Sequence, residues 1–257
     1  MRKWLLIFLI PLAFAPLSAR AQEYDDEEED FPGDDEIEVE EYSEYDEEEG
    51  SQEGTNERVK GFDIGGLALD MDYEKVRDAA KEHKFVLDKI DYSVPEYFGY
   101  NYDAQCRERN IFLSDSLKAC IEGLAKKDKM HYVSRVDFKK SDNDERLSVF
   151  FTSPVTGHTV WKIEYSNNVN KRLGTAKNFQ YQRDELRRAF WYNVQAKYGE
   201  PNAPPNRWVL DTNDEFSPEL IALFGKLTLQ SRRQYLFDAS ESVKEARRRF
   251  KFKDFSF

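Results

Sequence analysis

Three runs between His131 and Asn167 alternate apolar and polar residues with a period of two, which predicts half-buried β-strands. The residues expected on one face are Tyr132, Val136 and Phe138 in the first run, Leu147, Val149 and Phe151 in the second, and Trp161, Ile163 and Tyr165 in the third. The connections SDND and SPVTG are too short for the crossover that parallel strands require. The pattern therefore predicts an antiparallel meander with one apolar face that helices must cover.

Helical periodicity precedes the meander. Asp72 is placed to cap a helix, after which residues 85–94 read as a strand. Pro95 opens an aromatic segment of one or two helical turns that leads to Cys106. A further helix begins at Ser114 or Asp115. The apolar stripes expected on the two main helices are Val76, Ala79, Ala80 and His83 in the first, and Leu117, Cys120, Ile121 and Leu124 in the second.

A long helix is expected after the meander, because apolar residues recur at helical spacing up to Tyr198. Gly199 then suits a left-handed cap, and Pro201 prevents the helix from resuming. The runs RWVLD, ELIALF and KLTLQ predict three short strands, in a second smaller sheet or an extension of the first. Residues 240–249 suit a helix. The expected fold class is α+β, an antiparallel sheet with helices on one face.

The first 21 residues have the pattern of a secretory signal peptide. Arg2 and Lys3 precede an apolar run of about 14 residues, and Ala19-Arg20-Ala21 offers small residues at a cleavage site. A membrane anchor is the alternative, but the run contains two prolines and is shorter than the roughly 20 residues that a span needs. We expect cleavage after Ala21 and no later membrane-spanning segment.

Charge divides the rest of the chain in two. Of the 50 Asp and Glu residues, 20 lie between Gln22 and Glu57, where there is no Lys or Arg; the residues after Glu57 hold the other 30, with 35 Lys or Arg. An acidic block with so few apolar residues cannot offset its ordering entropy, so residues 22–57 should be disordered. Residues 58–257 suit one globular domain, with a possible internal boundary near residues 200–206.

Cys106 and Cys120 are the two cysteines of the chain. An exported chain with an even cysteine count usually pairs them, so we expect a disulfide that staples a helical hairpin against the sheet. Two buried thiols are the alternative. A redox pair is disfavoured because the cysteines are far apart in sequence and Cys120 is expected to face inward.

No local motif supports catalysis or a cofactor. The GxSxG, HExxH, CxxC, Walker and GxGxxG patterns do not occur, and the three histidines have no metal-ligand spacing, so each reads as structural. A secreted hydrolase whose site is assembled only in space stays an alternative function. Basic residues cluster late in the chain, but export and a net charge of −12 argue against nucleic acid as the partner.

The acidic tail admits three uses. It is a solubilising arm, a cover that folds back on the basic domain until a partner displaces it, or a segment that captures a basic partner or binds Ca²⁺ weakly. Binding of Ca²⁺ by the tail would make the chain a cation-responsive structural protein. Aromatic and branched residues punctuate the carboxylates, as in segments that dock apolar anchors after charge has steered the encounter. They are Tyr24, Phe31, Ile37, Val39, Tyr42 and Tyr45.

The order of LALDMDYEKV, a helical hairpin, a meander and a helix that ends in KYGEP resembles bacterial envelope domains of the BamE/SmpA and β-lactamase-inhibitor-protein type. The resemblance covers residues 62–201 and rests on the apolar-x-apolar-x-Met-polar motif before the first helix. Asp70 stands where that family usually has Gly, and the lipidated cysteine of BamE is missing. The resemblance implies a helical pair on an antiparallel sheet and a protein-binding role.

These features together predict an exported, non-catalytic domain of the bacterial periplasm or of the secreted fraction. The absence of an Asn-x-Ser/Thr acceptor also fits a bacterial envelope. The expected partner is a protein of the envelope, and the acidic tail is expected to modulate its binding. The predicted contact residues are Arg187, Arg188, Trp191 and Tyr192, because Trp, Tyr and Arg dominate interface hot spots. Burial of this aromatic pair in a second core face is the alternative.

Overall fold

The computed structural model of the chain describes residues 55–140, 145–167 and 179–250. The predicted signal peptide, residues 22–54 of the predicted tail and the closing run from Lys251 lie outside these residues. The helical elements are η1 (Glu57–Gly61), α1 (Tyr73–Glu82), α2 (Glu96–Glu108), α3 (Ser114–Lys127), η2 (Pro154–Thr156), α5 (Phe179–Tyr198) and α6 (Arg232–Phe250). The strands are β1 (Asp63–Ile64), β2 (Leu67–Ala68), β3 (Val86–Ser93), β4 (Tyr132–Lys140), β5 (Glu145–Phe151), β6 (Val160–Asn167), β7 (Arg207–Val209), β8 (Glu219–Leu223) and β9 (Lys226–Gln230).

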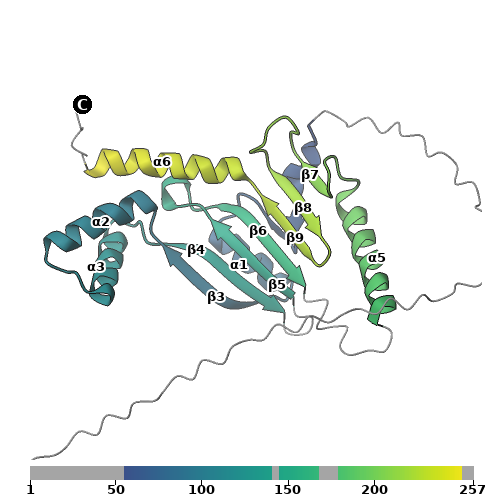
Figure 1. The fold of residues 1–257 in the computed structure, drawn as a ribbon, viewed down its shortest axis with the longest axis horizontal. Helices are drawn as coiled ribbons and strands as arrows, with labels where there is room; N and C mark the ends of the chain where they lie inside the picture. The colour runs from purple at the N-terminus through teal and green to yellow at the C-terminus, as the bar shows by residue number, and fades with distance from the viewer. Residues whose placement is uncertain (1–54, 141–144, 168–178, 251–257) are drawn as a thin grey trace, which may run out of the picture. The chain divides into compact units, whose positions relative to one another are not determined.

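A seven-stranded antiparallel sheet with the order β3-β4-β5-β6-β9-β8-β7 organises the fold (Figure 1). The predicted meander forms β4, β5 and β6, and the strand expected at residues 85–94 is β3, which pairs with β4 at the edge of the sheet. The three late strands extend this sheet rather than build a second one, because β9 pairs with β6. The strand that follows the connector at residues 200–206 thus joins the sheet that precedes it.

One face of the sheet carries the main hydrophobic core. The strand register places one buried apolar residue of each of five neighbouring strands in a single row. The row consists of Val136, Val149, Ile163, Leu229 and Leu220, each 0 % exposed. Helix α1 covers this face, behind the sheet in Figure 1, and α5 adds Val194 and Tyr198 to the same core. The predicted α+β class, with helices on one face of an antiparallel sheet, is confirmed.

Trp161 does not lie on the predicted face. Phe150 pairs with Lys162 and Phe151 pairs with Val160, so Trp161 is an extra residue in a β-bulge. The bulge resets the alternation of side chains, and Trp161 stacks on Phe150 and on Tyr235 of α6, at centroid distances of 6.1 and 4.7 Å. Phe151, by contrast, belongs to the main core. The period-two prediction for β6 therefore holds for Ile163 and Tyr165 and is wrong for Trp161.

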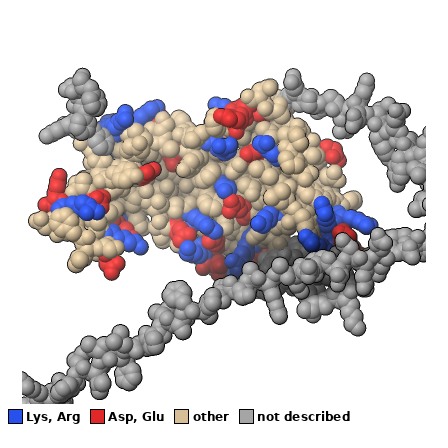
Figure 2. All heavy atoms as spheres, viewed as in Figure 1, with Lys and Arg blue, Asp and Glu red and all other residues tan. Residues whose placement is uncertain are grey.

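The other face of the sheet is polar. In the rows between the strands, Arg135 lies opposite Phe150, and Asp137 lies opposite Ser148, which donates a hydrogen bond of 2.6 Å to it. Lys and Arg side chains alternate with Asp and Glu side chains over the face seen in Figure 2. A mixed, charged surface of this kind is what a solvent-facing sheet requires.

Helix α1 begins as predicted, because the Asp72 carboxylate accepts a hydrogen bond of 2.9 Å from the backbone N–H of Lys75. The predicted apolar stripe is wrong for its last residue, His83. His83 is the C-cap residue and is exposed, so it follows the last helical turn instead of facing the core. Its imidazole lies directly against Gly66, where φ is +78° and a Cβ atom would collide with the ring.

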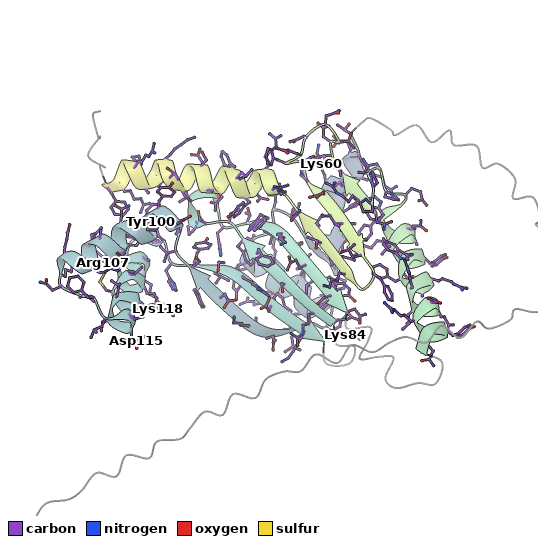
Figure 3. The ribbon with its side chains drawn as sticks, in the orientation of Figure 1. Lys60, Lys84, Tyr100, Arg107, Asp115 and Lys118 are labelled. Carbon is purple, nitrogen blue, oxygen red and sulfur yellow. A yellow bond between two sulfur atoms is a disulfide. The ribbon has the colours of Figure 1, made fainter. Side chains whose placement is uncertain are left out.

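The predicted disulfide joins Cys106 of α2 to Cys120 of α3, with the two Cα atoms 6.2 Å apart (Figure 3). Helix α2 is longer than the one or two turns expected. The hairpin does not pack on the sheet face. It forms a second core with the end of α6, where Phe250 contacts Phe98 and Tyr102.

The first residues that the structure describes, 55–57, belong to the predicted acidic tail but already form part of the folded domain. Thr55 forms a β-bridge with Asp211, and the backbone N–H of Asn56 donates a hydrogen bond of 2.7 Å to Leu210. Residue Val59 of η1 is then buried in the main core.

Helix α6 begins at Arg232, well before the predicted start at Ser240. Its early turns bury Asp238 and Ser242, so the inward face is polar and carries no apolar stripe to recognise. In the described part of the chain, none of the helices combines the length and the apolar character needed to cross a bilayer.

Candidate protein-binding surface

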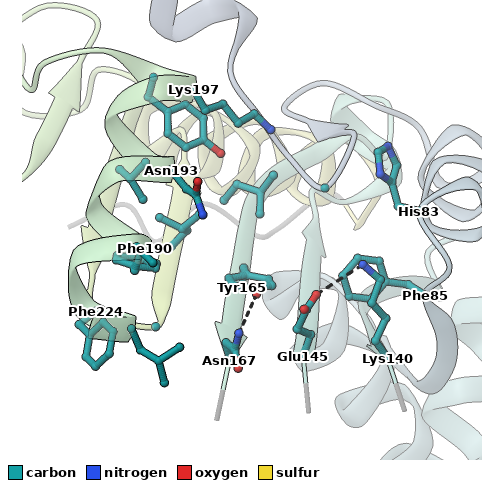
Figure 4. A pocket seen from close by; sticks show the side chains of 18 residues that line it. His83, Phe85, Lys140, Glu145, Tyr165, Asn167, Phe190, Asn193, Lys197 and Phe224 are labelled. Atoms are coloured by element: carbon teal, nitrogen blue, oxygen red, sulfur yellow. Dashed lines mark hydrogen bonds and ion pairs between the residues drawn. The ribbon is translucent and has the colours of Figure 1, made fainter. Parts of the chain in front are cut away.

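A groove of about 380 Å³ lies between α5 and the edge of the apolar sheet face (Figure 4). Phe85, Tyr165 and Leu227 line it from the sheet side, and Phe190 and Val194 line it from α5. These residues come from four segments spread over the 142 positions between Phe85 and Leu227. A cavity of this size with an apolar lining is typical of sites that bind side chains or small ligands.

Polar groups surround the groove at its rim. The Lys140 ammonium lies 3.4 Å from Glu145 and 4.5 Å from the centre of the Phe85 ring. Lys197 donates a hydrogen bond of 2.8 Å to Asp63. The side-chain oxygen of Asn167 is buried and has no hydrogen-bond partner among the described residues, while its amide nitrogen lies 3.4 Å from the Tyr165 hydroxyl. The rim therefore combines two lysine–carboxylate pairs with the amide of Asn167.

The C-terminal end of α5 is fixed to the domain by several contacts. Tyr198 donates a hydrogen bond of 2.7 Å to the Asp63 carbonyl, and burial, followed by the Asp63 charge, raises the pKa of its phenol. Burial opposes ionisation of the Asp63 carboxyl, but the hydrogen bonds from Lys197 and Gly66 outweigh it and lower its pKa. Gly199 ends the helix with a φ of +79°, and the Arg58 guanidinium packs where its Cβ would lie.

The outer side of α5 carries exposed aromatic and cationic residues. Tyr181 and Tyr192 are 72 % and 74 % exposed, and Arg188 lies between them at a spacing that keeps the three on one side of the helix. Towards the N-terminal end, Arg183, Asp184, Arg187 and Phe224 line a hollow of about 280 Å³.

Arg183, Arg187 and Arg188 share an electrostatic feature. Each is exposed, and none forms an ion pair within 4 Å with a carboxylate in the described residues. An unpaired guanidinium offers its donors to an incoming carboxylate. These three residues are called the α5 arginines below.

The four residues predicted to contact a partner do not share one surface. Arg187, Arg188 and Tyr192 are exposed, whereas Trp191 is half-buried, packs against the main core and contacts Phe190 at 5.1 Å between ring centroids. Trp191 packs with Phe190 against the main core, whereas Tyr192 points about 100° farther round the helix, on the side of Arg188. Sequence reasoning missed Tyr181, although its spacing of seven residues from Arg188 was a readable signal. It also missed the groove, for which no local signal exists.

A buried polar cluster joins α6 to η2 and is the place where a Ser, a His and an Asp come near one another. The Asp238 carboxylate accepts hydrogen bonds from the Ser153 backbone N–H at 2.9 Å and the Ser153 hydroxyl at 2.6 Å. The His158 ring bonds instead to the Val133 carbonyl, at 2.8 Å. The serine is therefore paired with the carboxylate and not with the imidazole, an arrangement that ties elements together and lacks the hydroxyl–imidazole contact of a nucleophilic site.

The histidines occupy separate positions. His131 stacks on Tyr92 at 5.0 Å, His158 lies between Phe151 and Tyr132, and His83 stands at the groove rim. Within residues 55–140, 145–167 and 179–250, no group of three or more His, Cys, Asp or Glu side chains is arranged to hold a metal ion.

Comparison of the chain with known protein families, curated proteins and solved structures gave no match.

Proposed function

We propose that this chain is an exported, non-catalytic protein-binding domain whose α5 groove receives a segment of another protein of the cell envelope. The acidic segment at residues 22–57 modulates that contact. The observation that carries the proposal is the groove itself, an apolar depression that shares Phe224 with a hollow lined by Arg183 and Arg187, which form no ion pair with a described carboxylate.

The groove has the composition of a recognition site. Aromatic side chains supply contact area at low entropic cost, and Arg donors at the margin supply orientation and steering. Phe190 and Tyr165 provide the contact area, and Arg183 and Arg187, which line the adjoining hollow beside Phe224, provide the orientation and steering. This arrangement favours a partner segment with apolar anchors and carboxylates near them.

Export is the second part of the proposal. The disulfide between Cys106 and Cys120 is compatible with an extracytoplasmic location, since such bonds persist in oxidising compartments. The N-terminal sequence, with its basic start, apolar run and small residues at positions 19–21, supports the same compartment.

Capture from an envelope extract tests the proposal on the mature chain, residues 22–257. The groove variant is Ala189→Glu/Asn193→Glu, which places two carboxylates on α5 positions that line the groove. The matched control is Ala104→Glu/Ala119→Glu, which adds the same charges to exposed positions of α2 and α3 outside the groove lining.

We expect the groove variant to lose about tenfold or more in capture of a partner that the control retains, since about 1.4 kcal/mol corresponds to tenfold. Equal capture by the two variants contradicts the assignment of the groove. An unmodified chain that captures nothing contradicts the binding function.

A further inference from the structure

The two edges of the seven-stranded sheet differ in how their backbone groups are paired. At the β7 edge, the Asn202 side chain forms hydrogen bonds of 2.9 and 2.8 Å with the backbone of Val209, and Ala203 exchanges two backbone hydrogen bonds of 3.0 Å with Arg207. At the β3 edge, the described residues place no further strand beyond Val86–Ser93 (Figure 1). An unpaired strand edge is a template for pairing with another strand.

The outward backbone groups of β3 belong to Ile90 and Tyr92. Residues of an antiparallel strand direct their N–H and C=O groups alternately to the two sides of the strand. The Asp91 carbonyl accepts a hydrogen bond of 3.2 Å from the Ser134 hydroxyl of β4, so Asp91 faces inward and its two neighbours face outward. Ser134 is the extra residue of a bulge on β4, which leaves the alternation of β3 unbroken at this point.

The apolar side chains of β3 suit antiparallel pairing with a second copy of the same strand, centred on Ile90. Ile90 lies opposite Val136, a member of the buried apolar row of the sheet, so the row would continue through both isoleucines into the second copy. Leu87 and Tyr92 are 48 % and 57 % exposed, and both lie opposite residues that belong to the main core or pack against it. In this register Tyr92 of one copy lies beside Leu87 of the other.

The charges on the polar face are complementary in the same register. Lys89 lies opposite Asp137 of β4, and Asp91 lies opposite Arg135. Pairing centred on Ile90 sets Lys89 opposite Asp91 of the second copy. Each row of charges across the joint then alternates in sign, and it extends the pair that Lys89 and Asp91 form within one strand at 2.9 Å. Opposite charges directly across a strand pair stabilise it, and like charges destabilise it.

We propose that the β3 edge is the interface of a twofold symmetric homodimer, in which two copies pair antiparallel about Ile90 and join their seven-stranded sheets into one. A twofold interface uses the same patch on both copies and closes the assembly at two. None of the β3 residues lines the α5 groove, so the inference stands apart from the proposed function.

The dimer is expected to be weak and reversible. A bulge at Asp88 interrupts the regular part of β3, so the paired stretch is short. Such an interface belongs to the small class that buries less than about 1,200 Å² in total, for which a dissociation constant on the order of micromolar is expected. The bulge and the charge of Lys89 also oppose uncontrolled growth of the sheet.

Sedimentation velocity and amide hydrogen exchange test the inference on the mature chain, residues 22–257, with its disulfide intact. We expect a monomer–dimer equilibrium across the micromolar range of concentration. The amides of Ile90 and Tyr92 are expected to exchange several-fold more slowly as the dimer forms. The amide of Val209 serves as the internal control, because Asn202 already occupies it at the other edge, and its exchange should not depend on concentration.

Two charge variants make the test specific. Lys89→Asp places carboxylates at both positions, and Asp91→Lys places ammonium groups at both, so each variant alone sets like charges opposite one another. We expect each to weaken its own association by about tenfold or more. A mixture of the two variants is expected to recover association, since opposite charges then face each other in both rows. The matched controls are Lys118→Asp and Asp115→Lys, at exposed positions of α3 (Figure 3), and each alone should dimerise normally.

Four results overturn the inference. The first is a chain that stays monomeric throughout the concentration range, including one whose β3 amides become protected only when envelope extract is added, which assigns the edge to a foreign strand. The second is a dimer that leaves the exchange of the Ile90 amide unchanged, which places the interface elsewhere. The third is normal association of Lys89→Asp or Asp91→Lys alone, and the fourth is a mixture of the two that does not associate.

Discussion

Helices α5 and α6 are of similar length and both are rich in arginine, yet the structure uses them in opposite ways. On α6 the carboxylate of Glu245 pairs with both Arg248 and Arg249, and Arg233 pairs with Asp214. On α5 the arginines have no such partners in the described residues. The difference shows that arginine content does not identify a binding surface. Asp184 and Glu185 lie at the same short spacings from the α5 arginines without pairing with them, so the side-chain arrangement decides whether the charge is available.

The inward faces of the two helices differ as well. Helix α5 contributes Val194 and Tyr198 to the main core and leaves an apolar groove beside it, whereas α6 buries Asp238 and Ser242 in a closed polar cluster. A satisfied buried network fixes one arrangement of its elements. We therefore interpret α6 as an element that stabilises the fold through its buried polar cluster, and α5 as the element that binds a partner.

The largest expected loss of stability comes from disrupting the buried polar cluster that joins α6 to η2. Asp238→Ala removes an acceptor shared by the Ser153 N–H and hydroxyl and by Thr156, and leaves buried donors unsatisfied. We expect the free energy of unfolding to fall by about 4 kcal/mol, measured by urea denaturation. Asp184→Ala, on the exposed side of α5, should change it by less than about 0.5 kcal/mol. An equal loss of stability in the two variants would contradict the assignment of a structural role to α6 and a binding role to α5.

Removal of the disulfide should loosen α6 and spare α5. In the chain-entropy relation a closed loop of about 15 residues is worth about 3 kcal/mol, so Cys106→Ala/Cys120→Ala should destabilise the domain by about that amount. Hydrogen exchange should speed up in α2, α3 and the end of α6, which Phe250 joins to them. Faster exchange that is strongest in α5 would contradict this connection.

Alkaline pH should lower the free energy of unfolding, because it ionises Tyr132, which lies near Asp238 of α6, and Tyr198 at the end of α5. Burial, followed by the Asp238 charge, raises the pKa of Tyr132 to about 12, and Tyr198 at the end of α5 is raised in the same direction. The folded state then holds these protons more tightly than the unfolded state, so the stabilisation is complete below about pH 10 and is lost as pH rises towards 12.

Tyr132→Phe should remove from this pH dependence a contribution on the order of 2–3 kcal/mol. The measurement is denaturant unfolding at several pH values between 9 and 12. A slope that Tyr132→Phe leaves unchanged would contradict the assignment of the shift to this phenol.

The smallest expected effect distinguishes the charges on the two helices. Hydrogen bonds from Arg248 and Arg249 lower the pKa of Glu245 to about 2, so the paired form stabilises the domain above the usual Glu pKa and the stabilisation is lost as pH falls towards 2. Glu245→Gln should cost less than about 1 kcal/mol at neutral pH and less still in high salt. Arg187→Gln should leave thermal unfolding unchanged. A salt-dependent loss on Arg187→Gln would show that this arginine is paired after all.

Local patterns predicted much of the fold and little of the site. Period-two apolarity predicted β4, β5 and β6 because one face of a strand must be buried, and Asp72 and Gly199 predicted helix ends because the backbone there needs a cap or a left-handed residue. The cysteine count predicted the disulfide. Of the predicted contact residues, Arg187, Arg188 and Tyr192 are exposed and Trp191 is half-buried; their contact with a partner stays a prediction.

The sequence by itself determined which segments are strands, which are helices and where the acidic charge lies, since backbone geometry and burial act over a few residues. Only the tertiary structure decided that Trp161 turns to the polar face, that α6 buries a carboxylate, and that Phe85, Phe190 and Leu227 meet in one groove. Those outcomes depend on which distant elements come together. A bulge, a shared hydrogen-bond acceptor or a gap between packed surfaces depends on two elements together. The sequence of either element alone therefore does not predict it.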